Sequence, residues 1–357
     1  MDLLQNLEVS VHRAKGFDAS RQLAVKGRYF EFMTWPDKWS SWILFATFKA
    51  FRLNRTKKFD MVWVTFPIAS ALVIAYWIAR LLNKPLVVDI RDPIWEEETW
   101  TDTVRNRLLR RIERKVLSQA QRIIFTSAGT IEKYRRRYPA LVEDKALLIT
   151  NGFDELDFAT LHPNCVKNGK KVFLHSGLLP KYERNPEAFF LAISDLKQKG
   201  IVDPLRHEFR LRACGHKKLY QQRIEELGIG DLLTFPAPIA YQHALAEMLG
   251  ADALMIFQDA TCNWQTPAKL FEYFRAGKPI LAWSDRQSDT GKLLATHCGN
   301  YVIESLRDSV KIAHALTVFL QKNDWQGQYT DIEQYSRQAL TKQLETLLCA
   351  VKVDDKT

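Results

Sequence analysis

Cysteine is scarce in this sequence, and no two cysteines have the spacing of a metal-binding pair. The 357 residues include five, at Cys165, Cys214, Cys262, Cys298 and Cys349. This distribution excludes zinc ribbons and disulfide frameworks, and it indicates a reducing compartment. The N-terminus lacks the basic segment and the long apolar run of a secretory signal, so we expect no such signal.

The composition lacks any bias typical of disordered or collagen-like chains. Hydrophobic residues make up 46% and charged residues 26%, which lies in the ordinary globular range. The length predicts two domains, each large enough for its own core. Lysine and arginine exceed aspartate and glutamate by ten. This surplus favours anionic partners, and it leaves phosphorylated substrates, anionic lipid and nucleic acid open.

One long stretch lacks charge altogether and has the length of a membrane span. Residues 61–79 are 19 residues without a charged side chain. However, Pro67 divides them into a β-branched and aromatic run and a segment with helical apolar spacing, and a second apolar run follows at 86–90. The pattern therefore favours a βαβ unit with buried parallel strands over a membrane span.

Strands and helices alternate along both halves of the chain, which predicts an α/β fold of two doubly wound, Rossmann-like domains facing a cleft. The expected strands are 7–11, 61–66, 86–90, 123–126, 147–150, 172–175, 208–213, 232–235, 253–257 and 280–283. The expected helices are 41–53, 68–79, 103–120, 128–137, 186–197, 218–227, 241–249, 267–276 and 331–350. The domains are expected at 1–156 and 172–330, with a linker at 157–171 and a C-terminal helix and tail at 331–357 that returns to the first domain.

Residues 266–280 carry the clearest chemical signal. Thr266 suits an N-cap, Pro267 suits the first helical position, and Gly277 suits the residue after the helix. The start of such a helix binds anions, and Lys269 adds a full charge. Glu272 would lie about 7.5 Å from Pro267 along the axis, the distance from a diphosphate to ribose hydroxyls. The alternative is that Lys269 and Glu272 form a surface pair.

Residues 267–273, PAKLFEY, followed by 276–280, AGKPI, resemble the signature of family 4 glycosyltransferases and their GT-B relatives. The resemblance covers most of the chain. It implies a GT-B fold in which Glu272 holds the ribose of a nucleotide-sugar and the helix start holds the phosphates. The first glutamate of the family's usual Glu-x7-Glu pair is missing, because Trp264 stands eight residues before Glu272. Donor handling is therefore expected to differ.

Two further segments match parts of the donor site of that family. Residues 173–179 and 183–186 resemble the first strand and loop of the C-terminal domain. There Gly177 would permit close approach, and Arg184, with Lys181 as second choice, would reach the diphosphate; the alternative is a solvated loop charge. Residues 235–239 resemble the loop beside the base, where the backbone around Pro238 would read the base edge. His175 either borders the donor site or packs in the core.

In the N-terminal domain, Asp92 follows an expected strand and is the candidate base or acceptor-orienting residue, with a turn or capping role as the alternative. The family normally opens with a strand and a glycine-rich loop, whereas this sequence begins one βα unit later. We interpret this as a truncated or reduced first domain. Arg184 and Lys269 would offset charge on the departing diphosphate. The sequence has no Asp-x-Asp pair, so no metal and no cofactor are expected, and the resemblance implies retention of configuration.

Basic residues are concentrated in the first 160 positions, with 26 basic against 19 acidic. A basic helix at 103–120 accompanies an aromatic cluster. The cluster consists of Trp35, Trp39, Trp42, Phe45, Phe48 and Phe51. Together they suggest a cytoplasmic protein at an anionic membrane surface; a core-packed aromatic helix beside a solvated basic face explains them equally well.

The sequence therefore predicts a glycosyltransferase that moves a sugar from a nucleotide-sugar to a glycan or lipid-linked acceptor of the cell envelope. The first alternative is a catalytically eroded nucleotide-binding or membrane-associated accessory protein. A nucleotide-sugar epimerase of the same fold is the second. Nucleic-acid binding is not expected, because the basic residues gather on one helix without a recognised binding motif.

Overall fold

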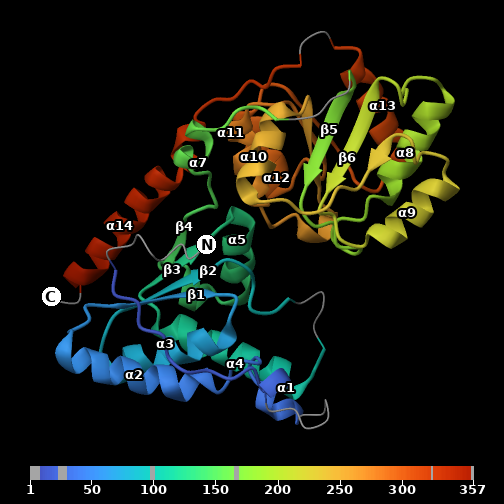
Figure 1. Ribbon diagram of the computed structural model, residues 1–357. Coiled ribbons are helices and arrows are strands. Elements are labelled where there is room, and N and C mark those ends of the chain that lie inside the picture. Colours follow the sequence, from blue (N-terminus) through green and yellow to red (C-terminus); the bar gives the residue numbers. More distant parts are fainter. Residues whose placement is uncertain (1–8, 23–29, 97–100, 165–168, 323–324, 355–357) are drawn as a thin grey trace. The chain divides into compact units, whose positions relative to one another are not determined.

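The computed structural model describes residues 9–22, 30–96, 101–164, 169–322 and 325–354 (Figure 1). The chain divides into two compact units, each built on its own parallel β-sheet. Unit 1 takes in residues 1–126, 134–148 and 345–357, and unit 2 takes in residues 127–133 and 149–344. The two parallel sheets confirm the predicted α/β fold.

Unit 1 contains a four-stranded sheet in sequential order. Its strands are β1 (Val62–Phe66), β2 (Leu86–Ile90), β3 (Arg122–Phe125) and β4 (Ala146–Leu148). Helices α3 (Ala69–Leu82) and α4 (Val104–Gln119) pack against the sheet, and α2 (Trp42–Thr56) packs on α3. The remaining helical segments are α1 (Ala19–Gln22), η1 (Glu31–Thr34), α5 (Ala128–Arg137), which both units share, and α6 (Pro139–Val142).

The long uncharged stretch folds as the predicted βαβ unit. Val62 of β1 pairs with Leu86 of β2 in a parallel register, and α3 connects the two strands. Helix α3 ends because Asn83 adopts a left-handed conformation just before Pro85. No helix in the described part of the chain is long and apolar enough to cross a membrane.

The prediction of a strand at residues 7–11 is wrong for the described residues 9–11, which form no strand. Residues 7 and 8 lie outside the described part of the chain. Side chains of α2 and the residue after it hold this segment instead. Lys49 Nζ donates to the Arg13 carbonyl at 2.8 Å, and Lys57 Nζ donates to Ser10 Oγ at 3.0 Å. An apolar alternation forms a strand only where a neighbouring backbone can complete the ladder.

A buried carboxylate anchors α4 in unit 1. Glu113 is fully buried and accepts hydrogen bonds from Trp95 Nε1, Tyr134 Oη and Tyr138 Oη, each at 2.6 Å. Arg137 lies 3.6 Å away as an ion-pair partner. Burial raises the pKa of Glu113, and these donors counteract part of that rise. The network fixes α4 against the segments that follow β2 and β3.

Unit 2 is a doubly wound domain with six parallel strands in the order β10-β9-β8-β5-β6-β7. The strands are β5 (Lys171–Ser176), β6 (His207–Arg212), β7 (Leu233–Thr234), β8 (Ala253–Phe257), β9 (Ile280–Trp283) and β10 (Tyr301–Glu304). All residues of β8 and β9 are buried, as expected for parallel strands covered on both faces. The order reverses between β5 and β8. Such a switch point is where doubly wound sheets bind ligands, beyond the carboxyl ends of the strands.

The helices of unit 2 connect these strands. They are α7 (Glu155–Ala159), α8 (Glu187–Gln198), α9 (Lys217–Glu226), α10 (Tyr241–Gly250), α11 (Lys269–Ala276), α12 (Asp289–His297) and α13 (Ser309–Leu320), with η2 (Ala260–Cys262) and η3 (Ile332–Tyr335). Strand β10 and helices α12 and α13 were not among the expected elements. The C-terminal helix α14 (Arg337–Asp354) begins later than expected, because η3 precedes it, and its residues from 345 onward group with unit 1.

Candidate functional site

Two loops of unit 2 meet at the switch point of its sheet. One loop, residues 177–186, follows β5, and the other, residues 258–268, follows β8 and leads into α11. The side chains that carry the candidate chemistry come from these loops, from the end of β5 and from α10 and α11. This is the position at which the fold alone predicts a ligand.

Helix α11 begins at Lys269, two residues later than expected. Thr266 makes no capping bond; Ala268 holds the N-cap position in a helical conformation without a side-chain cap. The preceding turn is tight, since Leu270 N donates to the Pro267 carbonyl at 2.9 Å. Thr266 and Pro267 thus lie in the approach to the helix and not in its first turn. Gly277 ends the helix in a left-handed conformation, as predicted.

The Lys269 side chain reaches back to the end of β5. Its Nζ lies 3.2 Å from His175 Nε2. Gly177 has a φ of +118°, and a Cβ at that position would lie 2.8 Å from Lys269 Nζ. A side chain at position 177 would therefore displace the amine as well as strain the backbone. Tyr273 Oη accepts a hydrogen bond from Ser176 N at 3.2 Å, which ties α11 to the same strand end.

Two cationic side chains share this site. Burial and then the nearby charge of Arg184 lower the pKa of Lys269 to about 7, while Glu272 opposes the change. Arg184 Nη1 makes one long contact, 3.5 Å, to the Leu178 carbonyl, and its Nε is buried without a hydrogen-bond partner among the described residues. No carboxylate of the described chain lies at ion-pair distance from either cation. An anion would satisfy both groups.

Glu272 lies one turn further along α11 and faces α10. Tyr241 Oη donates a hydrogen bond to Glu272 Oε1 at 2.8 Å. Burial raises the pKa of Glu272, and the bond from Tyr241 opposes that rise. The predicted surface pair of Lys269 and Glu272 is absent, because Lys269 turns to His175 and Glu272 to Tyr241. Tyr241 lies outside the motif, so its contact with Glu272 could not be predicted from the motif.

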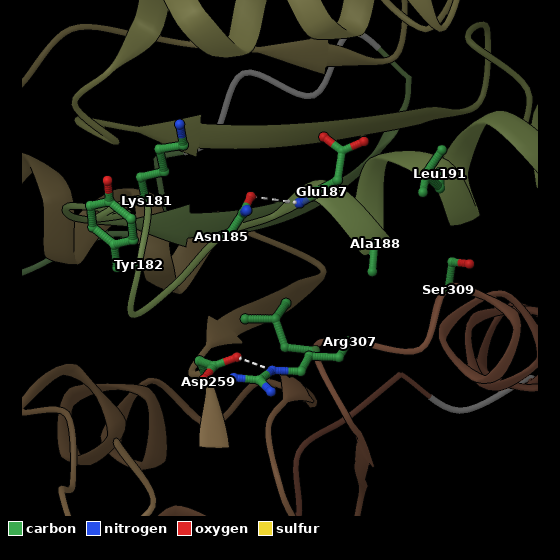
Figure 2. A pocket seen from close by; sticks show the side chains of 10 residues that line it. Lys181, Tyr182, Asn185, Glu187, Ala188, Leu191, Asp259, Arg307 and Ser309 are labelled. Atoms are coloured by element: carbon green, nitrogen blue, oxygen red, sulfur yellow. Dashed lines mark hydrogen bonds and ion pairs between the residues drawn. The ribbon is translucent and has the colours of Figure 1, made fainter. Parts of the chain in front are cut away.

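The remaining predicted site residues, Pro238, Lys181 and Asp92, are exposed. Pro238 lies in the loop before α10, where Arg212 Nη1 donates to the preceding Ala237 carbonyl at 2.6 Å. Lys181 lines a separate pocket of 470 Å³, which lies beside Asp259 and Arg307 (Figure 2). Its surroundings therefore differ from those of Arg184. Asp92 is exposed in unit 1, in the loop after β2.

Metal-binding geometry is absent from the described residues. They contain no group of three or more histidine, cysteine, aspartate or glutamate side chains that could hold a metal ion. The histidine closest to the site, His175, is occupied by a backbone carbonyl and by Lys269.

Comparison with known proteins agrees with this architecture. The family described as "Glycosyl transferase 4-like domain" matches residues 7–152. No curated protein sequence matches the chain.

Solved structures resemble the chain over most of its length. The sucrose-phosphate synthase of Thermosynechococcus elongatus has a TM-score of 0.63 at 13% identity and covers 93% of this chain and 82% of its own. The Anabaena protein HepE in complex with UDP-glucose has a TM-score of 0.61 at 15% identity; the match covers 86% of this chain and 82% of HepE. The UDP-GlcNAc 2-epimerase of Methanocaldococcus jannaschii has a TM-score of 0.55 at 10% identity; the match covers 87% of this chain and 82% of the epimerase.

At these identities the likeness establishes the fold and leaves the reaction open, since a synthase and an epimerase share it. The predicted GT-B architecture and the resemblance to family 4-like glycosyltransferases are both confirmed. Residues 7–152 therefore resemble the glycosyl transferase 4-like domain, and the chain as a whole has the two-sheet GT-B fold.

Proposed function

We propose that the protein is a glycosyltransferase that takes a sugar from a nucleotide-sugar and transfers it with retention of configuration. The observation that carries the proposal is a pair of cations, Arg184 and Lys269, that have no ion-pair partner among the described residues and lie at the switch point of a doubly wound sheet. Two like charges held close together destabilise the ligand-free site, and a diphosphate would relieve this repulsion. The UDP-glucose complex of HepE supports the same ligand class.

Each residue has a defined part in this reaction. Arg184 and Lys269 would bind the diphosphate and stabilise the charge that develops on it as the glycosidic bond breaks. Glu272 would accept hydrogen bonds from the ribose hydroxyls, and Tyr241 would keep the carboxyl ionised by donating to it. Asp92 is the proposed residue that orients the acceptor hydroxyl or removes its proton.

A thermal-shift panel of UDP, GDP, ADP and their sugar conjugates tests the donor site. One nucleotide should raise the melting temperature of the wild type, because it binds only the folded state. Glu272→Ala should lose that response, whereas Glu225→Ala, which removes an exposed glutamate from α9, should keep it. A flat response in the wild type would favour the eroded accessory protein, and turnover of the nucleotide-sugar without any acceptor would favour the epimerase.

We propose a lipid-linked or other cell-envelope acceptor, reached by a peripheral protein at the inner face of the membrane. The support comes from α2 and the residues just after it. Residues 42–58 contain five basic and no acidic side chains. Leu44, Phe48, Arg52 and Arg55 follow one another at helical spacing, and all four are exposed. An apolar and basic helix face of this kind fits an anionic lipid surface.

Sedimentation with lipid vesicles tests this surface. The protein should bind vesicles containing phosphatidylserine more tightly than vesicles of phosphatidylcholine, and added salt should weaken the binding. Phe48→Ser should weaken it roughly tenfold, since a buried phenylalanine contributes about 1.5–3 kcal/mol. Leu205→Ser, at an exposed leucine of unit 2, is the control and should have no effect. Equal binding by all variants would contradict the assignment of this face.

A further inference from the structure

His175 is a buried histidine whose tautomer is fixed by its neighbours. Its side chain is almost completely enclosed, and Nδ1 lies 2.9 Å from the Met255 carbonyl. A carbonyl oxygen can only accept, so Nδ1 carries the hydrogen. Burial, and then the charge of Lys269, lower the pKa of His175 well below its ordinary value, so the ring is neutral. Nε2 is therefore the nitrogen of the ring that can accept a hydrogen bond.

The Lys269 amine is the donor at this acceptor. Nζ lies 3.2 Å from His175 Nε2 and occupies the space that a Cβ at Gly177 would need. The amine is thus held from two sides, by a hydrogen bond to β5 and by van der Waals contact with the loop that follows it. A lysine side chain has four rotatable bonds, so without such contacts its charged end would have many positions available.

We propose that His175 is a positioning residue that holds the Lys269 amine over Gly177, so that its positive charge faces the diphosphate of the donor. The inference rests on the proposed function and deepens it. The chemistry of the acceptor matters here. A carboxylate in place of His175 would also bind the amine, but it would neutralise the charge and compete with the phosphate. A neutral imidazole fixes the amine and leaves the whole charge for the ligand.

Substitutions at His175 separate positioning from packing. His175→Phe keeps a planar ring against Phe257, 5.2 Å away between centroids, but removes the acceptor. His175→Gln places an amide oxygen where it can accept from Lys269. The matched control is His297→Phe, because His297 also bonds a backbone carbonyl through Nδ1 and a side-chain donor, Tyr335 Oη, through Nε2.

The first measurement is acetylation of the Lys269 amine from about pH 6 to about pH 10, followed by peptide mass spectrometry, because only the neutral amine reacts. Arg184 and Glu272 act on the same amine and are unchanged in all variants. His175→Phe should lower the midpoint by about one pH unit, since the acceptor favours the charged form. His175→Gln and His297→Phe should leave it near the wild-type value. A profile of His175→Phe that superimposes on the wild type, or equal shifts in both His175 variants, would overturn the proposal.

The second measurement is the affinity for the nucleoside diphosphate that stabilises the wild type. His175→Phe should weaken it roughly tenfold, the value of one hydrogen bond to a charged group, and His175→Gln should restore most of the loss. Unchanged affinity in His175→Phe would also refute the proposal that His175 positions the Lys269 amine to bind the diphosphate. If no nucleoside diphosphate binds the wild type, the proposed function fails. The acetylation profile then still decides whether His175 holds the amine.

Discussion

Replacing Lys269 by methionine should stabilise the ligand-free protein and at the same time remove its response to nucleoside diphosphates. The pKa of Lys269 is about 7 in the folded protein, against an ordinary value of 10.5. At 1.36 kcal/mol per pH unit, this difference corresponds to about 5 kcal/mol for a fully enclosed group. The side chain keeps part of its surface exposed, so solvent screening reduces the expected gain to about 2–3 kcal/mol.

The sign of the pH dependence follows from proton binding. Between about pH 7 and pH 10.5 the unfolded wild-type chain holds a proton that the folded protein lacks, so the free energy of unfolding contributed by Lys269 rises with pH across this window. Below about pH 7 both states are protonated and the folded state bears the full cost of the buried charge. Lys269→Met should therefore be most stabilising near pH 6 and should lose its advantage towards pH 10.

Urea unfolding of the full chain at several pH values measures this effect. The variant should unfold at higher urea near pH 6, and thermal melting should show a rise of about 5–10 °C. The nucleotide that stabilises the wild type should not stabilise the variant. Lys269→Leu provides a second apolar replacement, because its shorter side chain separates loss of charge from loss of packing. A variant that is less stable than the wild type near pH 6, or that keeps its nucleotide response, would refute the reasoning.

Three further substitutions test contacts inside the units, two of them in unit 2 and one in unit 1. Gly177→Ala should cost about 1–2 kcal/mol of unfolding free energy, measured by urea unfolding, because it forces an L-residue to a φ of +118° and meets Lys269; an unchanged midpoint would contradict this. Tyr241→Phe should raise the pKa of Glu272 further and weaken nucleoside diphosphate binding several-fold in titration calorimetry, since the carboxylate loses its donor; equal affinities would dismiss the contact. Glu113→Ala should destabilise unit 1 by about 3–5 kcal/mol in thermal melting, because it removes the acceptor of two phenols and an indole and the ion-pair partner of Arg137. A loss below about 1 kcal/mol would show that water replaces the carboxylate.

The sequence predicted most of the order of strands and helices, because parallel strands are buried on both faces and form unbroken apolar runs; β10, α12 and α13 were missed. The residues of β2 were predicted at their observed bounds, and those of β1 differ by one residue. The segment at 9–11 shows the limit, since an alternating pattern does not reveal whether a partner strand exists. Glu113 shows another limit, because a glutamate in an arginine-rich helix is expected at the surface and is fully buried here.

Only those residues of the candidate site that lie close together in the sequence could be predicted. The motif around α11 singled out Lys269 and Glu272, because both follow a helix start. Their partners come from elsewhere in the chain: His175 precedes Lys269 by 94 positions, and Tyr241 precedes Glu272 by 31. No helical or strand periodicity spans such separations. The strand order of unit 2 brings these residues together, and that order depends on the whole domain.

The contact between Gly177 and the Lys269 amine also constrains how this protein can evolve. Because the amine fills the space beside Gly177, a larger residue at position 177 becomes acceptable only after residue 269 has lost its amine. Once the amine is gone, the acceptor at position 175 has no donor, and selection on that histidine is relaxed. In an alignment of homologues, lysine at 269 and histidine at 175 should therefore be gained and lost together, and both should occur only with glycine at 177, which the φ of +118° favours independently.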